Sequence, residues 1–134
     1  MIVVDASVVV KVLTEERGST VAADRFIREP SRTPDWLKAE IASALSKKVR
    51  YGGLPIESAE RSLAALAVIM PDMAPSEPLI SNALILSVAL RHAFYDCLYL
   101  SLAIDHDCLL LTADKKFFAA VAATDQKHRV ELLQ

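Results

Sequence analysis

Short apolar runs alternate along the chain with longer segments in which apolar residues recur at helical spacing. Two of the runs, at residues 2–4 and 108–111, are unbroken, as in strands that are buried on both faces of a sheet. The helical spacing predicts helices over residues 6–13, 19–28, 36–51, 55–70, 76–91, 96–105 and 115–122. Three further short strands are expected near residues 32–33, 72–74 and 130–133.

This alternation of strands and helices predicts an α/β fold. Its centre would be a mainly parallel sheet of about five short strands, because parallel neighbours need helical crossovers, which cover both faces of the sheet. The length of 134 residues fits one domain, 1–134, and no repeat, linker or low-complexity segment divides it. A hydrophobic content of 53% suits a doubly covered sheet or an oligomer interface.

Four acidic residues fall at an end or in the first turn of these elements: Asp5, Glu40, Asp96 and Asp114. Asp5 and Asp114 follow separate buried strands, and in a parallel sheet the carboxyl ends of the strands border the ligand crevice. Glu40 has only Leu37 and Ala44 as neighbours at helical spacing, so it flanks an apolar stripe. Carboxylates in apolar surroundings are costly without a positive partner, which predicts a shared site for Mg²⁺ or Mn²⁺.

Each acid also has a simpler interpretation. Asp96 is as consistent with a helix cap as with a metal ligand, and Asp114 is as consistent with a turn. The apolar flanks of Asp5 and Glu40 favour a functional role.

The hydroxyls next to the strand-end acids are further candidates. Ser7 lies two residues after Asp5, and Thr112 lies two residues before Asp114, so both are placed to position a water molecule or the carboxylates. Local capping or turn bonding explains them equally well. The three histidines show no HxxxH spacing, which argues against acid/base and zinc roles. Tyr95 and Tyr99 are expected in the core or an interface and not as base-stacking groups.

The charge pattern is compatible with a phosphate-bearing partner, although the net charge of -2 argues against one at first sight. When the four acids are set aside, 13 of the 17 acidic residues remain against 15 basic residues. Bound cations would reverse the sign of the site itself. Basic residues cluster at 47–50, 115–116 and 127–129, although such clusters are more often solvated surface.

The sequence predicts a cytoplasmic protein with no membrane segment. The longest apolar stretch, residues 79–90, is far shorter than the roughly 20 residues that cross a bilayer, and the N-terminus lacks the pattern of a secretory signal. Cys97 and Cys108 lie in apolar surroundings without a CxxC spacing, which indicates reduced core residues.

Four segments together resemble the signature blocks of PIN-domain ribonucleases, and in particular the VapC-type toxins of toxin–antitoxin pairs. They read IVVDASVVVKVL, LKAEIASAL, FYDCLYLSLA and LLLTADKKF, and they occur in the family's order across almost the whole chain. The family's catalytic acids then fall on Asp5, Glu40, Asp96 and Asp114. The segment after Asp114 departs from the pattern, because Lys115, Lys116 and Phe117 include no further acid, so a complete second metal site is not expected.

The resemblance implies a fold, an activity and partners. The fold would be a PIN-type three-layer α/β/α sandwich, and the activity would be RNA cleavage that depends on Mg²⁺ or Mn²⁺. The partners would be a second copy of the chain, in a homodimer, and a cognate antitoxin that blocks the active site. Ser7 and Thr112 would be water-positioning residues.

Other functions remain to be compared with this one. A phosphatase of the haloacid-dehalogenase type needs a second Asp two residues after the first, where this chain has Ser7. A receiver domain needs an acidic pair and a phosphoacceptor Asp on another strand, which is not found. The remaining alternative is a non-catalytic α/β module that binds RNA or protein and uses its acids as helix caps.

Overall fold

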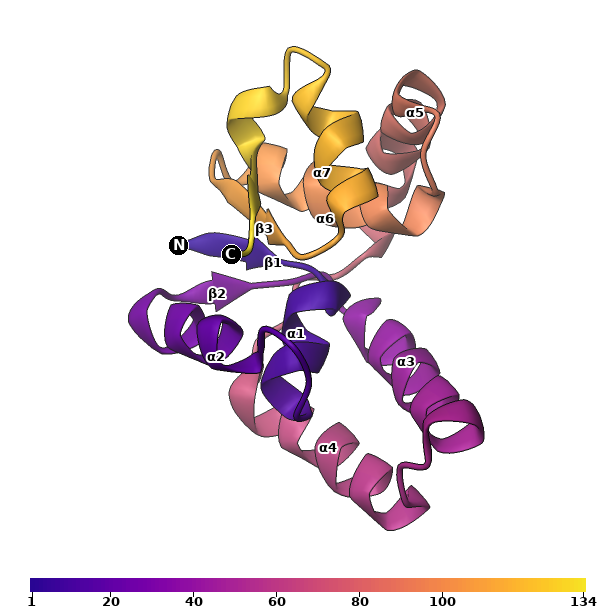
Figure 1. Ribbon diagram of the computed structural model, residues 1–134. Helices are drawn as coiled ribbons and strands as arrows, with labels where there is room; N and C mark the ends of the chain where they lie inside the picture. Colours follow the sequence, from indigo (N-terminus) through magenta and orange to yellow (C-terminus); the bar gives the residue numbers. More distant parts are fainter.

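The computed structural model describes residues 1–134, and its strands form one parallel sheet in the order β2-β1-β3-β4 (Figure 1). The strands are β1 (Ile2–Val4), β2 (Ser31–Arg32), β3 (Leu109–Thr112) and β4 (Val130–Leu132). The two inner strands, β1 and β3, are in register with Val4 opposite Leu111. The residues that follow these two strands therefore emerge side by side at one edge of the sheet.

Helices cover both faces of the sheet, which confirms the predicted three-layer α/β/α architecture (Figure 1). On one side lie α5, α6 and α7, with α6 against the inner strands; on the other lie α1 and α2, and the hairpin of α3 and α4 extends away from the sheet. The helices are α1 (Ala6–Leu13), α2 (Ser19–Arg28), α3 (Leu37–Gly52), α4 (Ile56–Ile69), α5 (Ile80–Leu90), α6 (Phe94–Asp105) and α7 (Lys115–Ala122). Single 3₁₀ turns precede α5 at Glu77–Leu79 and β4 at Lys127–Arg129.

Helix boundaries follow from local chemistry. Asp5 accepts hydrogen bonds from the backbone N–H groups of Ser7 and Val8 and so starts α1, and Asp114 starts α7 in the same way. The end of α3 is set by Gly53, whose backbone has a φ of 73° that favours glycine, and its N–H bonds to the carbonyl of Lys48. The two N-terminal caps place both strand-end acids, Asp5 and Asp114, at the start of a helix.

The strand expected near residues 72–74 is wrong. That segment makes only an isolated bridge between Pro34 and Ala74, flanked by hydrogen bonds from Ala74 N to Thr33 O and from Asp35 N to Ala74 O. Prolines 34, 71 and 75 have no backbone N–H to donate, so the pairing cannot extend into a ladder. The sheet consequently has four strands and not about five.

One apolar core of 26 buried residues joins the layers, and it includes all of β1 and the middle of α6. Cys97 is buried and Cys108 partly buried, and both are free thiols. No single helix is long and apolar enough to span a membrane. The segments Glu77–Leu90 and Phe94–Asp105 reach that length and apolar content only when they are taken together, and they are bent by 114° relative to each other. Most of that second segment lies in the protein core.

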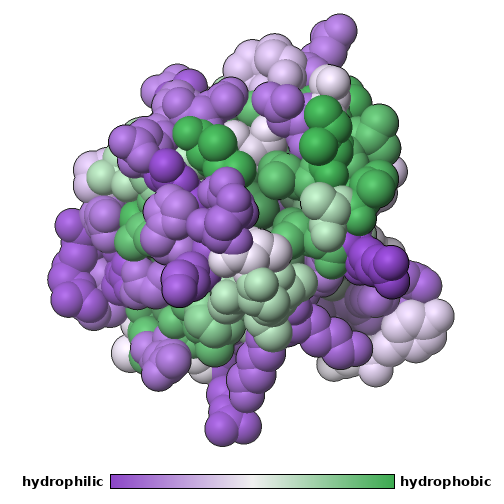
Figure 2. All heavy atoms as spheres, turned by 90° about the horizontal axis from the view of Figure 1, so that it is seen from above, coloured by the Kyte–Doolittle hydropathy of each residue, from purple (hydrophilic) through white to green (hydrophobic).

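Apolar side chains also gather on the outer face of α5. Ile80, Leu84, Ile85 and Val88 are all exposed, with Val88 71% exposed. Figure 2 shows apolar residues on the side of the molecule where α5 lies. Leu79 and Ala83 on the opposite face of this segment are buried against α6, as the helical spacing predicted.

Candidate active site

The two strand-end acids use only one carboxylate oxygen each to cap a helix. Oδ1 of Asp5 accepts from Ser7 N at 3.0 Å and from Val8 N at 3.4 Å. Oδ1 of Asp114 accepts from Lys116 N at 2.9 Å and from Phe117 N at 3.1 Å. Both acids therefore cap a helix, and Oδ2 of each lies outside the cap.

Ser7 and Thr112 connect these two acids. The Ser7 hydroxyl donates to Oδ1 of Asp5 and accepts a hydrogen bond from Ala113 N at 2.8 Å. Its oxygen also lies 3.3 Å from Oγ1 of Thr112, which accepts from Asp114 N at 3.1 Å. The two hydroxyls thus link the ends of β1 and β3.

Asp96 and Glu40 reach the same region from helices. Asp96 is in the first turn of α6, but the helix begins at Phe94 with Ala93 in the capping position, so the alternative of Asp96 as a helix cap is wrong. Its Oδ2 instead accepts from Nε2 of His92 at 2.7 Å. Glu40, in the first turn of α3, accepts through Oε1 from the hydroxyl of Tyr99 at 2.7 Å, and Tyr99 is fully buried.

The structure brings the ligand atoms of Asp96 and Asp114 close together, and electrostatic interactions link Asp96 to Asp5 and to Glu40. Burial raises the pKa of Asp5 to about 7, and the charge of Asp96 adds to this, while the hydroxyls of Ser7 and Thr112 oppose it. Burial also raises the pKa of Glu40, again with a contribution from Asp96. The pKa of Asp96 is itself raised by burial and by Asp114, against the opposing effect of its hydrogen bond and charge interaction with His92.

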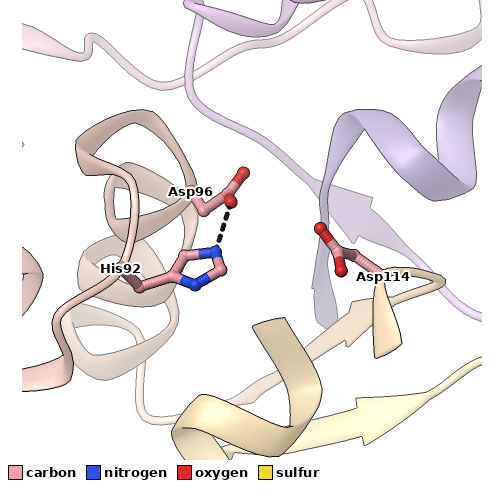
Figure 3. A group of neighbouring side chains, drawn as sticks. All are labelled: His92, Asp96 and Asp114. Carbon is pink, nitrogen blue, oxygen red and sulfur yellow. Dashed lines mark hydrogen bonds and ion pairs between the residues drawn. The ribbon is translucent and has the colours of Figure 1, made fainter. Parts of the chain in front are cut away.

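The side chains at this edge of the sheet fit a divalent cation. His92, Asp96 and Asp114 offer ligand atoms that all lie within 4.8 Å of one another, and Figure 3 shows Asp96 and Asp114 extending toward the same gap from α6 and from the loop after β3. None of the four acids forms a salt bridge with Lys or Arg. Half-buried carboxylates without a cationic partner are costly, and a hard, oxygen-preferring ion removes that cost.

Sequence reasoning did not assign a role to two residues of this region. His92 was set aside because the chain has no HxxxH pattern, yet it contacts Asp96 and its ring stacks on Phe117 with centroids 4.9 Å apart. The spacing of four residues between His92 and Asp96 was the available signal. Tyr95 is not in the core, because it is 50% exposed and stacks on Trp36; its expected place in an interface stays a prediction. The expectation of a core position is confirmed for Tyr99.

Comparisons with known proteins agree with this arrangement. Residues 2–123, which include all four acids, match the model of the PIN domain family. Ribonuclease VapC1 of Mycobacterium tuberculosis (strain CDC 1551 / Oshkosh) is 34% identical over 121 residues, which cover 88% of this chain and 89% of that protein. The protein of the same name from strain ATCC 25618 / H37Rv gives the same identity and coverage. The chain therefore belongs to the PIN-domain family, in which it is similar to the VapC ribonucleases.

Proposed function

We propose that this protein is a VapC-type toxin, a metal-dependent endoribonuclease that hydrolyses RNA phosphodiester bonds. The observation that carries the proposal is the position of Asp96, which lies close to Asp114, adds its charge to the effect of burial in raising the pKa values of Asp5 and Glu40, and has no Lys or Arg as an ion-pair partner. Carboxylates arranged in this way can hold a divalent cation next to a phosphate group.

In this proposal Asp5, Glu40, Asp96 and Asp114 hold Mg²⁺ or Mn²⁺. When bound, the cation supplies Lewis-acid stabilisation of the phosphodiester and activation of water. Ser7 and Thr112 keep the two strand ends at a fixed separation through their hydrogen bonds. Glu40 is suited to take a proton, because burial raises its pKa and its Oε2 is not used by Tyr99.

Cleavage of a defined single-stranded RNA tests the proposal directly. We expect the purified protein to cut it with Mg²⁺ or Mn²⁺ and to leave a 5′-phosphate, because water attacks phosphorus without help from the 2′-hydroxyl. Excess EDTA should stop the reaction. Cleavage that continues in EDTA, or that yields a 2′,3′-cyclic phosphate, would contradict the mechanism, and binding without any cleavage would favour the non-catalytic module.

A cognate antitoxin is the protein partner that we propose. A groove of about 640 Å³ lies between α3 and α4, lined largely by apolar side chains such as Leu63, Leu66 and Met70. Its position on α3, the helix that carries Glu40, supports docking of an antitoxin helix beside the active site. Expression of the chain alone should arrest bacterial growth, and co-expression of the neighbouring small reading frame should relieve it; normal growth with soluble, active protein would contradict the toxin assignment.

We also propose that the chain acts as a single domain, in a cytoplasmic homodimer. The exposed apolar face of α5, formed by Ile80, Leu84, Ile85 and Val88, supports self-association, because large apolar side chains that lie together on a surface favour an interface. Analytical ultracentrifugation should give a dimer for the wild-type protein and a monomer for Leu84→Glu. A monomeric wild-type protein would contradict this part of the proposal.

A further inference from the structure

A pocket of about 430 Å³ opens beside Glu40, between the start of α1 and the exposed face of α3. It is lined by small apolar side chains and by six polar, charged or aromatic residues: Ser7, Trp36, Glu40, Ser43, Lys47 and Tyr95. Its volume lies in the range of about 300–1,000 Å³ that is usual for sites of small ligands. Because Ser7 and Glu40 belong to both the pocket and the candidate active site, a ligand in this pocket lies next to the reacting group.

Two aromatic rings form one wall of the pocket. Trp36 and Tyr95 stack with centroids 4.5 Å apart and planes inclined by 10°, and Phe94 makes an edge contact with Tyr95 at 5.4 Å. The backbone N–H of Trp36 donates to Ser76 at 2.9 Å, which holds the start of α3 in place. Tyr95 remains 50% exposed in this arrangement. The result is a preformed aromatic surface that is open to solvent.

Lys47 supplies positive charge at the other end of the pocket. Glu40, Ser43 and Lys47 follow one another at helical spacing on α3, which puts Lys47 about 10 Å along the helix axis from Glu40. Lys47 forms no salt bridge, whereas its neighbour Lys48 is bound to Glu16. Its ammonium group is therefore free for a phosphate.

We propose that this pocket binds an unpaired nucleotide of the RNA strand next to the bond that is cut, with the base stacked on Tyr95 and a backbone phosphate at Lys47. The inference rests on the proposed ribonuclease function. An exposed aromatic face combined with a free cation is the arrangement by which proteins hold single-stranded nucleic acid. Double-stranded RNA does not fit, because its bases are already stacked on one another.

Trp36 is the only tryptophan in the chain, so its fluorescence reports on this pocket alone. A short single-stranded RNA titrated in EDTA, where the strand is not cut, should quench the emission in a saturable manner. The same strand with abasic sites should bind more weakly and quench less. Equal quenching by the abasic strand would overturn base stacking, as would unchanged emission on addition of the intact strand.

Variants of Tyr95 and Lys47 test the contact with the base and the contact with the phosphate separately. Tyr95→Ala should weaken RNA binding by roughly five- to a hundredfold, the effect of losing one base–aromatic stack, and Tyr95→Phe should restore it. Lys47→Ala should reduce the salt dependence of binding. Tyr51→Ala is the matched control, because Tyr51 is 80% exposed and does not line the pocket. Wild-type affinity in Tyr95→Ala that melts like wild type would overturn the subsite.

Cleavage of the same strand distinguishes a failure of the subsite from a failure of the proposed function. We expect Tyr95→Ala to raise KM with little change in kcat, because stacking holds substrate and transition state alike. If the wild-type protein and Tyr95→Ala cut the RNA equally well, the subsite is wrong and the ribonuclease function stands. If base-dependent quenching occurs without any cleavage, the subsite stands and the function is wrong. Quenching by an apolar helical peptide and not by RNA would assign the pocket to a protein partner.

Discussion

His92 holds Asp96 from outside the helix that carries it. Nε2 of His92 donates to Oδ2 of Asp96 across 2.7 Å, and the imidazole ring stacks on Phe117, which is fully buried in α7. The ring is therefore fixed between α7 and the first turn of α6. As a consequence, the direction of the Asp96 carboxylate is set by protein contacts before any cation binds.

We predict that His92→Ala weakens binding of Mn²⁺ by about tenfold or more, the usual scale for loss of a group that orients a metal ligand. His92→Gln should recover part of the affinity, since its amide can still donate to Asp96. The stabilisation of thermal unfolding as a function of Mn²⁺ concentration measures the effect. His106→Ala is the control, because His106 is exposed at the other end of α6. A well-folded His92→Ala protein with wild-type Mn²⁺ affinity would show that His92 has no positioning role.

Asp96→Asn should reduce kcat/KM by about a hundredfold or more, because the amide keeps the shape of the side chain and loses the charge that attracts the cation. Asp105→Asn is the matched control at the exposed C-terminal end of the same helix and should change the rate by no more than a few fold. Initial rates on a fluorogenic RNA give both values. Equal rates for the two variants would remove Asp96 from the site.

Much of this fold follows from hydrophobic periodicity, because buried strands and amphipathic helices leave strong patterns. The sequence predicted β1, β3 and all seven helices, and the rule for parallel strand ends brought Asp5 and Asp114 together. The strand predicted near residues 72–74 does not form, because the prolines around Ala74 lack the backbone N–H groups that a strand ladder needs. Contacts across a turn, such as that of His92 with Asp96, depend on where α6 begins, and the helix starts at Phe94, two residues earlier than expected.

Tyr99→Phe should shift the acidic limb of the pH–rate profile to higher pH. The hydroxyl of Tyr99 donates to Glu40 and lowers the pKa of that carboxyl, against the larger effect of burial. Without the donor the pKa of Glu40 rises further, so a higher pH is needed to ionise it. Rates between pH 5 and pH 8 at saturating Mn²⁺ check this. An unchanged limb would mean that ionisation of Glu40 does not limit the reaction.

The stability of the metal-free protein should depend on pH through Asp5. This carboxyl has a pKa of about 7 in the folded state against an ordinary value of 3.8, so the folded state binds the additional proton between those values. The stability that the protonated group contributes is fully present below pH 3.8 and is lost as the pH rises through 7. Asparagine cannot lose a proton and caps a helix about as well as aspartate. In EDTA the melting temperature of Asp5→Asn relative to wild type should therefore increase between pH 5 and pH 8, by roughly 5 °C or more.

Saturating Mg²⁺ should reverse that advantage at pH 8, because a cation that binds the ionised carboxylate stabilises the wild-type protein and not the variant. Asp105→Asn, measured alongside, is the matched control, since Asp105 is exposed at the C-terminal end of α6. Thermal unfolding at four pH values, with EDTA and with Mg²⁺, is sufficient. If the melting curves of wild type and Asp5→Asn shift in parallel with pH, the buried carboxyl of Asp5 does not exchange its proton for a cation, and the proposed metal site loses its most deeply buried ligand.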